Sequence, residues 1–283
     1  AFAYSEKLGK EVDADILIAT DPDCDRVALE VKNSAGEYVF LNGNKIGALL
    51  SYYIFSQRSA LDNLPEHPVL VKSIVTGDLS RAIASHYGVE TVETLTGFKN
   101  ICGKANEYEV TKAKSYLFGY EESIGFCYGT FVRDKDAVSA SMMVVEMAAY
   151  YKERGQTLLD VLENIYTTFG YYNERQIALE LEGVEGQERI ARIMNDFRQR
   201  PLKAVADMTL QTTIDFKEDY QEFPKQNCLK YYFDEESWYA LRPSGTEPKI
   251  KLYLYTIGQT QADSLAKLDA IEAACRKKIE QVQ

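Results

Sequence analysis

Apolar and polar positions follow two periods along the chain up to Phe169. Apolar runs of strand length stand at residues 14–20, 27–31, 37–41, 69–71, 89–92 and 115–118. Apolar residues at helical spacing stand at residues 5–12, 45–57, 79–87, 137–151 and 158–169. Strands that alternate with helices are typical of a mainly parallel, doubly wound sheet, in which ligand-binding loops follow the carboxyl ends of the strands.

The pattern changes after residue 175. Strands are predicted at residues 176–181, 238–241 and 249–256, and helices at 185–198 and 262–279, which indicates an α+β domain. We therefore expect three parts, at residues 1–41, 42–175 and 176–283. The predicted fold class is α/β, with doubly wound mixed-sheet domains, one partial and one complete, followed by a smaller α+β C-terminal domain. The first part has too few strands to cover both faces of such a sheet, so we expect the first half of its domain to be missing.

Composition narrows the class of protein. The 283 residues are 46% hydrophobic and 27% charged, which is typical of a globular protein of two or three domains. The net charge of −11 argues against nucleic acid as a partner, although a few basic side chains suffice to bind an anionic metabolite. No apolar run is long enough for a membrane span and the first residues lack a secretory signal, so we expect no membrane and a cytoplasmic location. The five cysteines form no C-x-x-C pair, which predicts buried, reduced thiols.

The sequence DPDCDR at residues 21–26 follows a predicted strand. Three carboxylates at alternate positions repel one another unless a cation or a proton neutralises them, and oxygen ligands suit Mg²⁺. An EF-hand loop is excluded because Arg26 and Lys32 occupy the places of its glycine and its glutamate. A haloacid-dehalogenase phosphatase loop, D-x-D-x-T/V, is disfavoured because Asp25 stands in its last place. A solvated acidic turn, in which Arg26 pairs with the carboxylates, is the plain structural alternative.

A second loop, RPSGTEP at residues 242–248, offers groups that bind anions. Arg242 carries a guanidinium that can contact two phosphate oxygens, Ser244 and Thr246 carry hydroxyls, and Gly245 lets backbone N–H groups approach an anion. The alternative is an ordinary type I turn with Pro243 at its second position.

Three further polar segments lie in the middle part: TGFK at 96–99, GYEESIG at 119–125 and RDKD at 133–136. Each by itself is better explained by a capped turn than by a binding site. Together and in this order, DPDCDR, TGFKN, GYEESIG, RDKDA and RPSGTEP resemble the α-D-phosphohexomutase family, close to its phosphoglucomutase branch, over essentially the whole chain. The resemblance implies four domains around a cleft. A phosphoserine on the first domain would exchange its phosphoryl group with a hexose phosphate through a hexose 1,6-bisphosphate, which acts as intermediate and activator.

This chain would then supply the later part of the second domain, the third domain and the fourth. The resemblance assigns the Mg²⁺ ligands to Asp21, Asp23 and Asp25, and a catalytic place next to the substrate to Arg26. The sugar hydroxyls are assigned to Glu121 and Ser123, with Thr96 and Gly97 in the neighbouring loop. Lys135 resembles a substrate-phosphate contact, and Arg133 stands beside it. The phosphate clamp is assigned to Arg242, Ser244, Gly245 and Thr246. Ala137 stands where relatives often have Gly, which bears on the conformation of that loop.

The family's nucleophile loop, T-A-S-H-N-P-like, is not found. The segment at residues 84–86 imitates its centre, but Tyr87 follows in place of Asn and the segment lies near the end of a predicted helix. We therefore expect part of a Mg²⁺-dependent mutase for hexose 1- and 6-phosphates, inactive by itself, whose partners are a phosphosugar and the missing N-terminal domains. Two other functions stay open: a non-catalytic phosphosugar-binding module, and a Mg²⁺-dependent phosphatase with Asp21 as nucleophile. The preferred sugar and the oligomeric state are not predicted.

Overall fold

The computed structural model describes residues 2–218, 220, 223–233, 236–245 and 247–282. The chain forms two compact units, Ala1–Phe169 and Gly170–Gln283. The predicted boundary after residue 175 lies within a strand of the second unit, and the predicted division of the first unit at residues 41–42 stays a prediction. None of the helices formed by the described residues is both long and apolar enough to cross a membrane.

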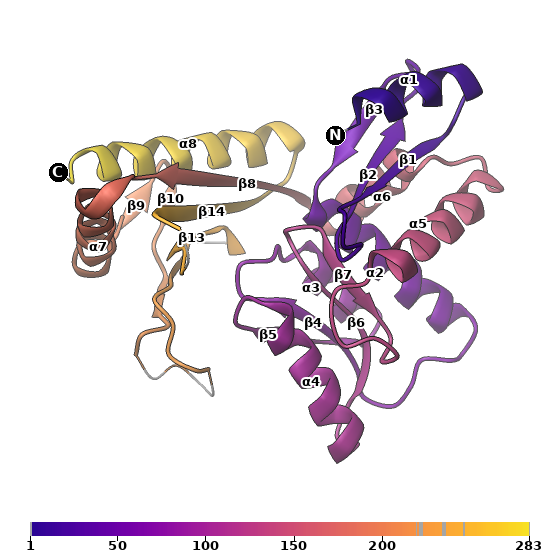
Figure 1. Cartoon of the computed structure of the whole chain (residues 1–283), viewed down its shortest axis with the longest axis horizontal. Coiled ribbons are helices and arrows are strands. Elements are labelled where there is room, and N and C mark those ends of the chain that lie inside the picture. Colours follow the sequence, from indigo (N-terminus) through magenta and orange to yellow (C-terminus); the bar gives the residue numbers. More distant parts are fainter. Residues whose placement is uncertain (1, 219, 221–222, 234–235, 246, 283) are drawn as a thin grey trace. The chain divides into compact units, whose positions relative to one another are not determined.

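The first unit begins with a helix and a three-stranded antiparallel meander (Figure 1). Helix α1 (Ala3–Val12) precedes β1 (Ile16–Thr20), β2 (Val27–Lys32) and β3 (Tyr38–Leu41), and β2 lies between the other two strands. These are the three strands expected from the sequence, but they run antiparallel. The connections at residues 21–26 and 33–37 are the reason, because parallel neighbours need a crossover of a dozen or more residues.

The second sheet of this unit is mixed, with strand order β5-β4-β6-β7. Its strands are β4 (Pro68–Ser73), β5 (Glu90–Thr94), β6 (Ser115–Glu121) and β7 (Gly125–Tyr128). Strands β5 and β6 pair parallel to β4, and β7 pairs antiparallel to β6. The helices are α2 (Gly43–Ala60), α3 (Leu79–His86), α4 (Phe98–Thr111), α5 (Ala137–Lys152) and α6 (Leu158–Phe169).

Helices α3 and α4 cover opposite faces of this sheet. Val71 of β4 belongs to the core cluster that includes Ile101 of α4. Lys72 points to the other face, where its register partner Tyr120 donates a hydrogen bond of 2.7 Å to Ser80 of α3. The doubly wound arrangement is therefore confirmed for this sheet, as is the predicted α/β class. Helix α4 and strand β7 were not predicted, and the loop expected at residues 119–125 is a tight β6–β7 hairpin.

The second unit is an antiparallel sheet covered on one face by helices. The strand order is β11-β12-β13-β14-β8, with β8 (Tyr171–Glu180), β11 (Thr212–Asp215), β12 (Leu229–Tyr232), β13 (Trp238–Pro243) and β14 (Lys249–Gly258). A two-stranded ribbon, β9 (Ala204–Val205) and β10 (Met208–Thr209), follows α7 (Gly183–Gln199), and α8 (Gln261–Glu280) comes last. Alternate residues of β14, among them Leu252 and Leu254, pack with Phe197 of α7 and Ile271 of α8. The predicted α+β character of this part is confirmed.

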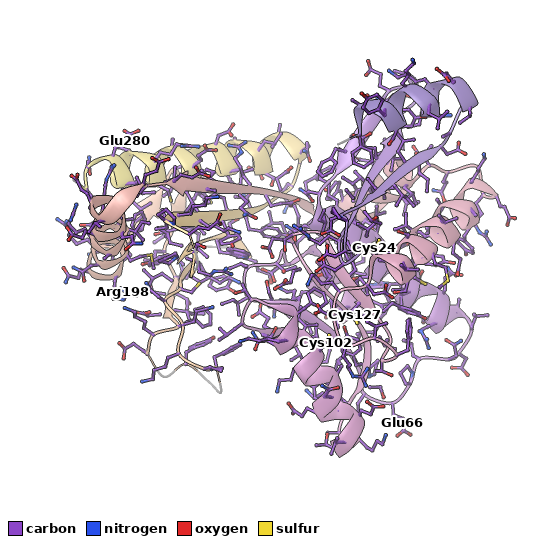
Figure 2. All side chains as sticks on the ribbon, viewed as in Figure 1. Cys24, Glu66, Cys102, Cys127, Arg198 and Glu280 are labelled. Carbon is purple, nitrogen blue, oxygen red and sulfur yellow. The ribbon has the colours of Figure 1, made fainter. Side chains whose placement is uncertain are left out.

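The cysteines are free thiols, as expected from their spacing. Cys102, Cys127, Cys228 and Cys275 are buried, whereas Cys24 is exposed. Figure 2 shows Cys24 in the connection between β1 and β2, and Cys102 and Cys127 in the body of the first unit. The prediction of buried thiols is therefore wrong for Cys24, which stands in the acidic loop at residues 21–26 with φ of 54°.

Candidate functional site

The acidic loop at residues 21–26 connects β1 to β2 and is organised by Asp21. Oδ1 of Asp21 accepts hydrogen bonds from the backbone N–H groups of Asp25 (3.1 Å) and Arg26 (3.0 Å), and Oδ2 accepts one from Nε of Arg26 (2.6 Å). The backbone hydrogen bond from Arg26 contributes most to lowering the pKa of Asp21 to about 2. Desolvation opposes this shift, and the side-chain hydrogen bonds with Arg26 and Asp25 add to it. Asp21 thus closes the acidic loop by binding both the backbone and the side chain of Arg26.

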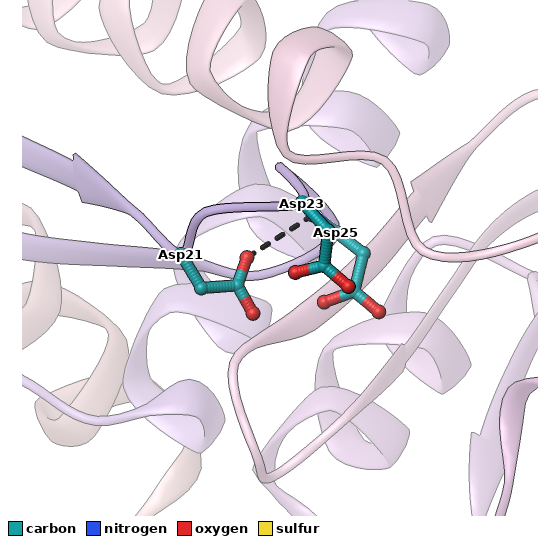
Figure 3. A group of neighbouring side chains, drawn as sticks. All are labelled: Asp21, Asp23 and Asp25. Atoms are coloured by element: carbon teal, nitrogen blue, oxygen red, sulfur yellow. Dashed lines mark hydrogen bonds between the residues drawn. The ribbon is translucent and has the colours of Figure 1, made fainter.

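The three aspartates of this loop meet the requirements of a hard cation. Asp21, Asp23 and Asp25 each offer one carboxylate oxygen, and these oxygens lie within 4.8 Å of one another (Figure 3). Oδ1 of Asp25 is buried and accepts no hydrogen bond, although Nε of Arg26 lies 3.4 Å away. A buried carboxylate oxygen without a hydrogen bond is costly unless a cation coordinates it. An all-oxygen set of this kind fits Mg²⁺.

Lys135 supplies a positive charge to this loop from the segment before α5. Its Nζ lies 2.8 Å from Oδ2 of Asp25 and 3.0 Å from Oδ1 of Asp134, and 5.2 Å from the ring centroid of Phe98. Burial opposes the charge of Lys135, but the hydrogen bonds to Asp25 and Asp134 raise its pKa overall. The backbone N–H of Ala137 donates to the carbonyl of Cys24 (3.1 Å), so the start of α5 is attached to the acidic loop.

The β6–β7 hairpin brings the predicted sugar-binding residues to the same place. Oε1 of Glu121 accepts a hydrogen bond of 2.6 Å from the backbone N–H of Gly97, which precedes α4 with φ of 107°. The carbonyl of Ile124 accepts a hydrogen bond of 3.1 Å from Val27, directly after the acidic loop. Ser123, in the turn between the two strands, is exposed. Thr96, Gly97, Glu121 and Ser123 thus lie beside the acidic loop at one end of the first unit.

Arg133 is placed elsewhere. Its guanidinium donates to the side chains of Asn106 and Glu109 on α4 and to the carbonyl of Thr130. These partners lie more than a turn along α4 from Phe98, whose ring is next to Lys135. The predicted substrate contact of Arg133 stays a prediction, and the structure gives the side chain a different set of partners.

In the second unit, the predicted phosphate-binding segment at residues 242–248 comprises the end of β13 and the connection to β14. Arg242 and Pro243 are the last residues of β13 rather than loop residues. The backbone N–H of Ser244 donates to the carbonyl of Lys249 (2.8 Å), and Oγ of Ser244 accepts from the N–H of Glu247 (3.3 Å). Gly245 is exposed, and Thr246 lies outside the described residues.

The structure adds Lys251 to the cationic groups of this loop. Lys251 of β14 is the register partner of Arg242 on β13, so the two side chains share one face of the sheet. Within the described part of the chain, no carboxylate forms an ion pair with either side chain, whereas Lys249 pairs with Glu180 (3.0 Å) and Glu247 (3.2 Å). Like charges directly opposite each other are unfavourable without an anion between them. Sequence reasoning missed Lys251; only the cross-strand register could have indicated it.

Comparisons with known proteins show which family the chain is similar to. Residues 42–169 match the family model of phosphoglucomutase/phosphomannomutase, alpha/beta/alpha domain III. The phosphoglucomutase of Staphylococcus epidermidis is 38% identical over 265 residues, which cover 90% of this chain and 47% of that protein. The phosphoglucomutase of Staphylococcus aureus strain MSSA476 is 37% identical over 282 residues, 96% of this chain and 50% of that protein. The chain spans about half the length of the curated relatives it matches, and corresponds to their C-terminal part.

Solved structures show the same fold. The pp63/parafusin phosphoglucomutase of Paramecium gives a TM-score of 0.72 at 16% identity, covering 99% of this chain and 49% of that chain. The N-acetylphosphoglucosamine mutase of Aspergillus fumigatus, in complex with GlcNAc-6P and magnesium, gives 0.53 at 14% identity, covering 96% and 52%. Residues 42–169 therefore belong to the phosphoglucomutase/phosphomannomutase domain III family, and the chain as a whole is similar over most of its length to the C-terminal part of phosphoglucomutases.

Proposed function

We propose that this chain carries the metal-binding, sugar-binding and distal phosphate-binding parts of a Mg²⁺-dependent phosphohexomutase. The reaction is the interconversion of a hexose 1-phosphate and a hexose 6-phosphate, most closely that of a phosphoglucomutase, and the phosphoserine that it needs lies outside this chain. One observation carries the proposal: the acidic loop, with its unbonded Asp25 oxygen, lies directly beside the hairpin of Glu121 and Ser123. A cation site next to groups that bind hydroxyls is what phosphoryl transfer to a sugar requires.

Each group has a role that its surroundings support. Asp21, Asp23 and Asp25 would hold Mg²⁺, which, when bound, supplies positive charge to a transferring phosphoryl group. The magnesium bound by the Aspergillus mutase supports this assignment. Arg26 is held at Nε by Asp21, yet its side chain is 52% exposed, so its remaining N–H groups face solvent and can reach an anionic substrate. This is the catalytic role proposed for Arg26.

The sugar and its second phosphate have separate contacts. Glu121, which accepts a hydrogen bond from the backbone N–H of Gly97, would also accept hydrogen bonds from sugar hydroxyls, while Ser123 offers an exposed hydroxyl. Arg242 and Lys251 together form a cationic pair that an anion would stabilise, next to the backbone of Ser244 and Gly245. Hexose 1,6-bisphosphate fits as intermediate and activator because both kinds of contact serve a sugar with two phosphates.

Calorimetry with glucose 1-phosphate tests the proposal. The chain is titrated with glucose 1-phosphate, with free glucose and with inorganic phosphate in the presence of Mg²⁺. We expect glucose 1-phosphate to bind more tightly than free glucose and more tightly than inorganic phosphate. A glucose 1-phosphate affinity no higher than these two would contradict the proposal. The same protein is then incubated with glucose 1-phosphate, a trace of glucose 1,6-bisphosphate and Mg²⁺. Steady formation of glucose 6-phosphate by this chain alone would show that no outside phosphoserine is needed.

A further inference from the structure

The turn at residues 122–124, which follows Glu121 and contains Ser123, is held in an unfavourable conformation. Ile124 has φ of 58°, in the left-handed region, which a β-branched residue rarely adopts. Such a conformation persists only where surrounding contacts impose it. The contacts around Glu122 therefore decide where Glu121 and Ser123 lie.

A reciprocal pair of hydrogen bonds attaches Glu122 to Thr76, in the loop between β4 and α3. The hydroxyl of Thr76 donates to Oε2 of Glu122 (3.2 Å), and the backbone N–H of Glu122 donates to Oγ1 of Thr76 (3.3 Å). Oγ of Ser73 lies 2.8 Å from Oγ1 of Thr76. Oγ of Ser73 also lies 3.4 Å from Oε2 of Glu122, so both hydroxyls are within hydrogen-bond distance of this carboxylate oxygen. Ser73 and Thr76 are both fully buried, so this geometry is shielded from water.

The buried ammonium group of Lys72 holds the backbone of Thr76 in place. Nζ of Lys72, which is fully buried, donates to the carbonyl of Thr76 (2.8 Å) and lies 2.9 Å from Oδ1 of Asp78 and 3.0 Å from Oε1 of Glu93. The position of Thr76 is thus set by the core of the sheet and not by solvent-exposed loops.

The first turn of α2 supports the other side of the same hairpin turn. A Cβ atom at Gly43 would lie 2.2 Å from the carbonyl oxygen of Glu122 and 2.8 Å from the backbone nitrogen of Ile124. The adjacent Asn44 accepts a hydrogen bond of 2.8 Å from the backbone N–H of Gly77, next to Thr76. The turn therefore lies between Thr76 and α2, with its backbone in contact with both.

We infer that Glu122 and Thr76 are positioning residues that set the recognition of the sugar hydroxyls, while Glu121 and Ser123 make the contacts. The inference rests on the proposed function, since it concerns how that site reads its sugar. The carboxylate of Glu122 acts by holding the turn through Thr76. The hydrogen bond from Thr76 depends on the acceptor oxygen of Glu122 more than on its negative charge. Glutamine keeps such an oxygen and alanine does not.

The experiment compares binding of glucose 1-phosphate, galactose 1-phosphate and inorganic phosphate by the full chain in the presence of Mg²⁺. The two sugar phosphates differ only in the orientation of one hydroxyl group, so the ratio of their affinities measures how well the site distinguishes that hydroxyl group. We expect Thr76→Val and Glu122→Ala to weaken glucose 1-phosphate by about tenfold and to bring that ratio toward one, with phosphate affinity unchanged. Glu122→Gln and Thr76→Ser, which retain the hydrogen-bonding atoms, should stay close to the parent.

A double-mutant cycle with Ser123→Ala separates positioning from general stability. Ser123→Ala should weaken glucose 1-phosphate in the parent and have almost no further effect in the Thr76→Val chain, because Ser123 is then already misplaced. Full additivity of the two changes, or a Thr76→Val chain that keeps the parent's sugar ratio, overturns the inference and leaves the proposed function intact. If Thr76→Val does not fold, the same cycle is measured with Glu122→Ala and decides in the same way. A parent chain that binds inorganic phosphate and glucose 1-phosphate equally overturns the proposed function and the inference with it.

Discussion

Replacing Lys135 by methionine should strengthen Mg²⁺ binding to this chain. In the structure, Nζ of Lys135 lies 2.8 Å from Oδ2 of Asp25, the aspartate whose other oxygen is buried without a hydrogen bond. A divalent cation and the ammonium of Lys135 therefore compete for one carboxylate. Methionine removes the charge, and with it the contact of Nζ with the ring of Phe98, but keeps an unbranched apolar chain of similar length.

The size of the effect follows from the exposure of the pair. The side chains of Lys135 and Asp25 are 21% and 29% exposed, so the pair is neither fully solvated nor dry. Two unit charges at contact are worth roughly 4 kcal/mol at an effective dielectric constant of about 20, and exposed pairs are worth about 1 kcal/mol or less. We take the interaction energy of Lys135 with Asp25 as roughly 1–2 kcal/mol, between these limits. Its loss should lower the Kd for Mg²⁺ by about tenfold.

Calorimetric titration of Mg²⁺ at low ionic strength measures this change. Lys152→Met is the matched control, because it changes the net charge by the same amount. Lys152 pairs with Asp15 (2.6 Å), which lies at the other end of β1 from the acidic loop. The control should alter Mg²⁺ affinity far less than Lys135→Met. If Lys135→Met binds Mg²⁺ no better than the control, Lys135 does not compete with the cation and the reasoning is wrong. The same variant should bind glucose 1-phosphate more weakly, because its proposed contact with the phosphate is lost.

Three further outcomes are expected. Arg242→Ala should lower the affinity for glucose 1-phosphate, measured by calorimetry, by about tenfold to a few hundredfold, and Arg242→Lys should recover part of this loss. Lys251→Met should also lower the affinity. Unchanged affinity in all three variants would refute the phosphate clamp. Because the folded pKa of Asp21, about 2, lies below its ordinary value of 3.8, its contribution to stability is present above pH 4 and is lost as the pH falls toward 2. Carboxyl chemical shifts should report this midpoint, and a midpoint near 4 would contradict the hydrogen bonds from Arg26. A thiol reagent should modify Cys24 first, since the other cysteines are buried, and Mg²⁺ should slow the reaction; mass spectrometry of peptides would reveal another order.

The sequence by itself determined most of the elements and the residue types of the site. Apolar periods predicted the three strands before residue 42 and the helices at 137–151 and 158–169, because burial of one face imposes a period on the residues of an element. Helix α4 was missed although its buried residues recur at helical spacing, at Phe98, Ile101, Cys102, Ala105 and Tyr108. Strand β7 was missed because four residues are too few to show a period. The acidic loop could be recognised locally, since its three carboxylates repel one another wherever the chain folds.

Only the tertiary structure decided which of these groups meet. Asp25 contacts Lys135 from a distant segment, Glu121 binds the N–H of Gly97, and Lys251 stands opposite Arg242 because of the register of β13 and β14. Arg133, next but one to Lys135 in the sequence, is bound by α4 instead. The physical reason is that a periodic pattern reports which face of an element is buried, while the partner of that face depends on strand register, turn conformation and helix packing. These are set by contacts far apart in the chain, which no local pattern contains.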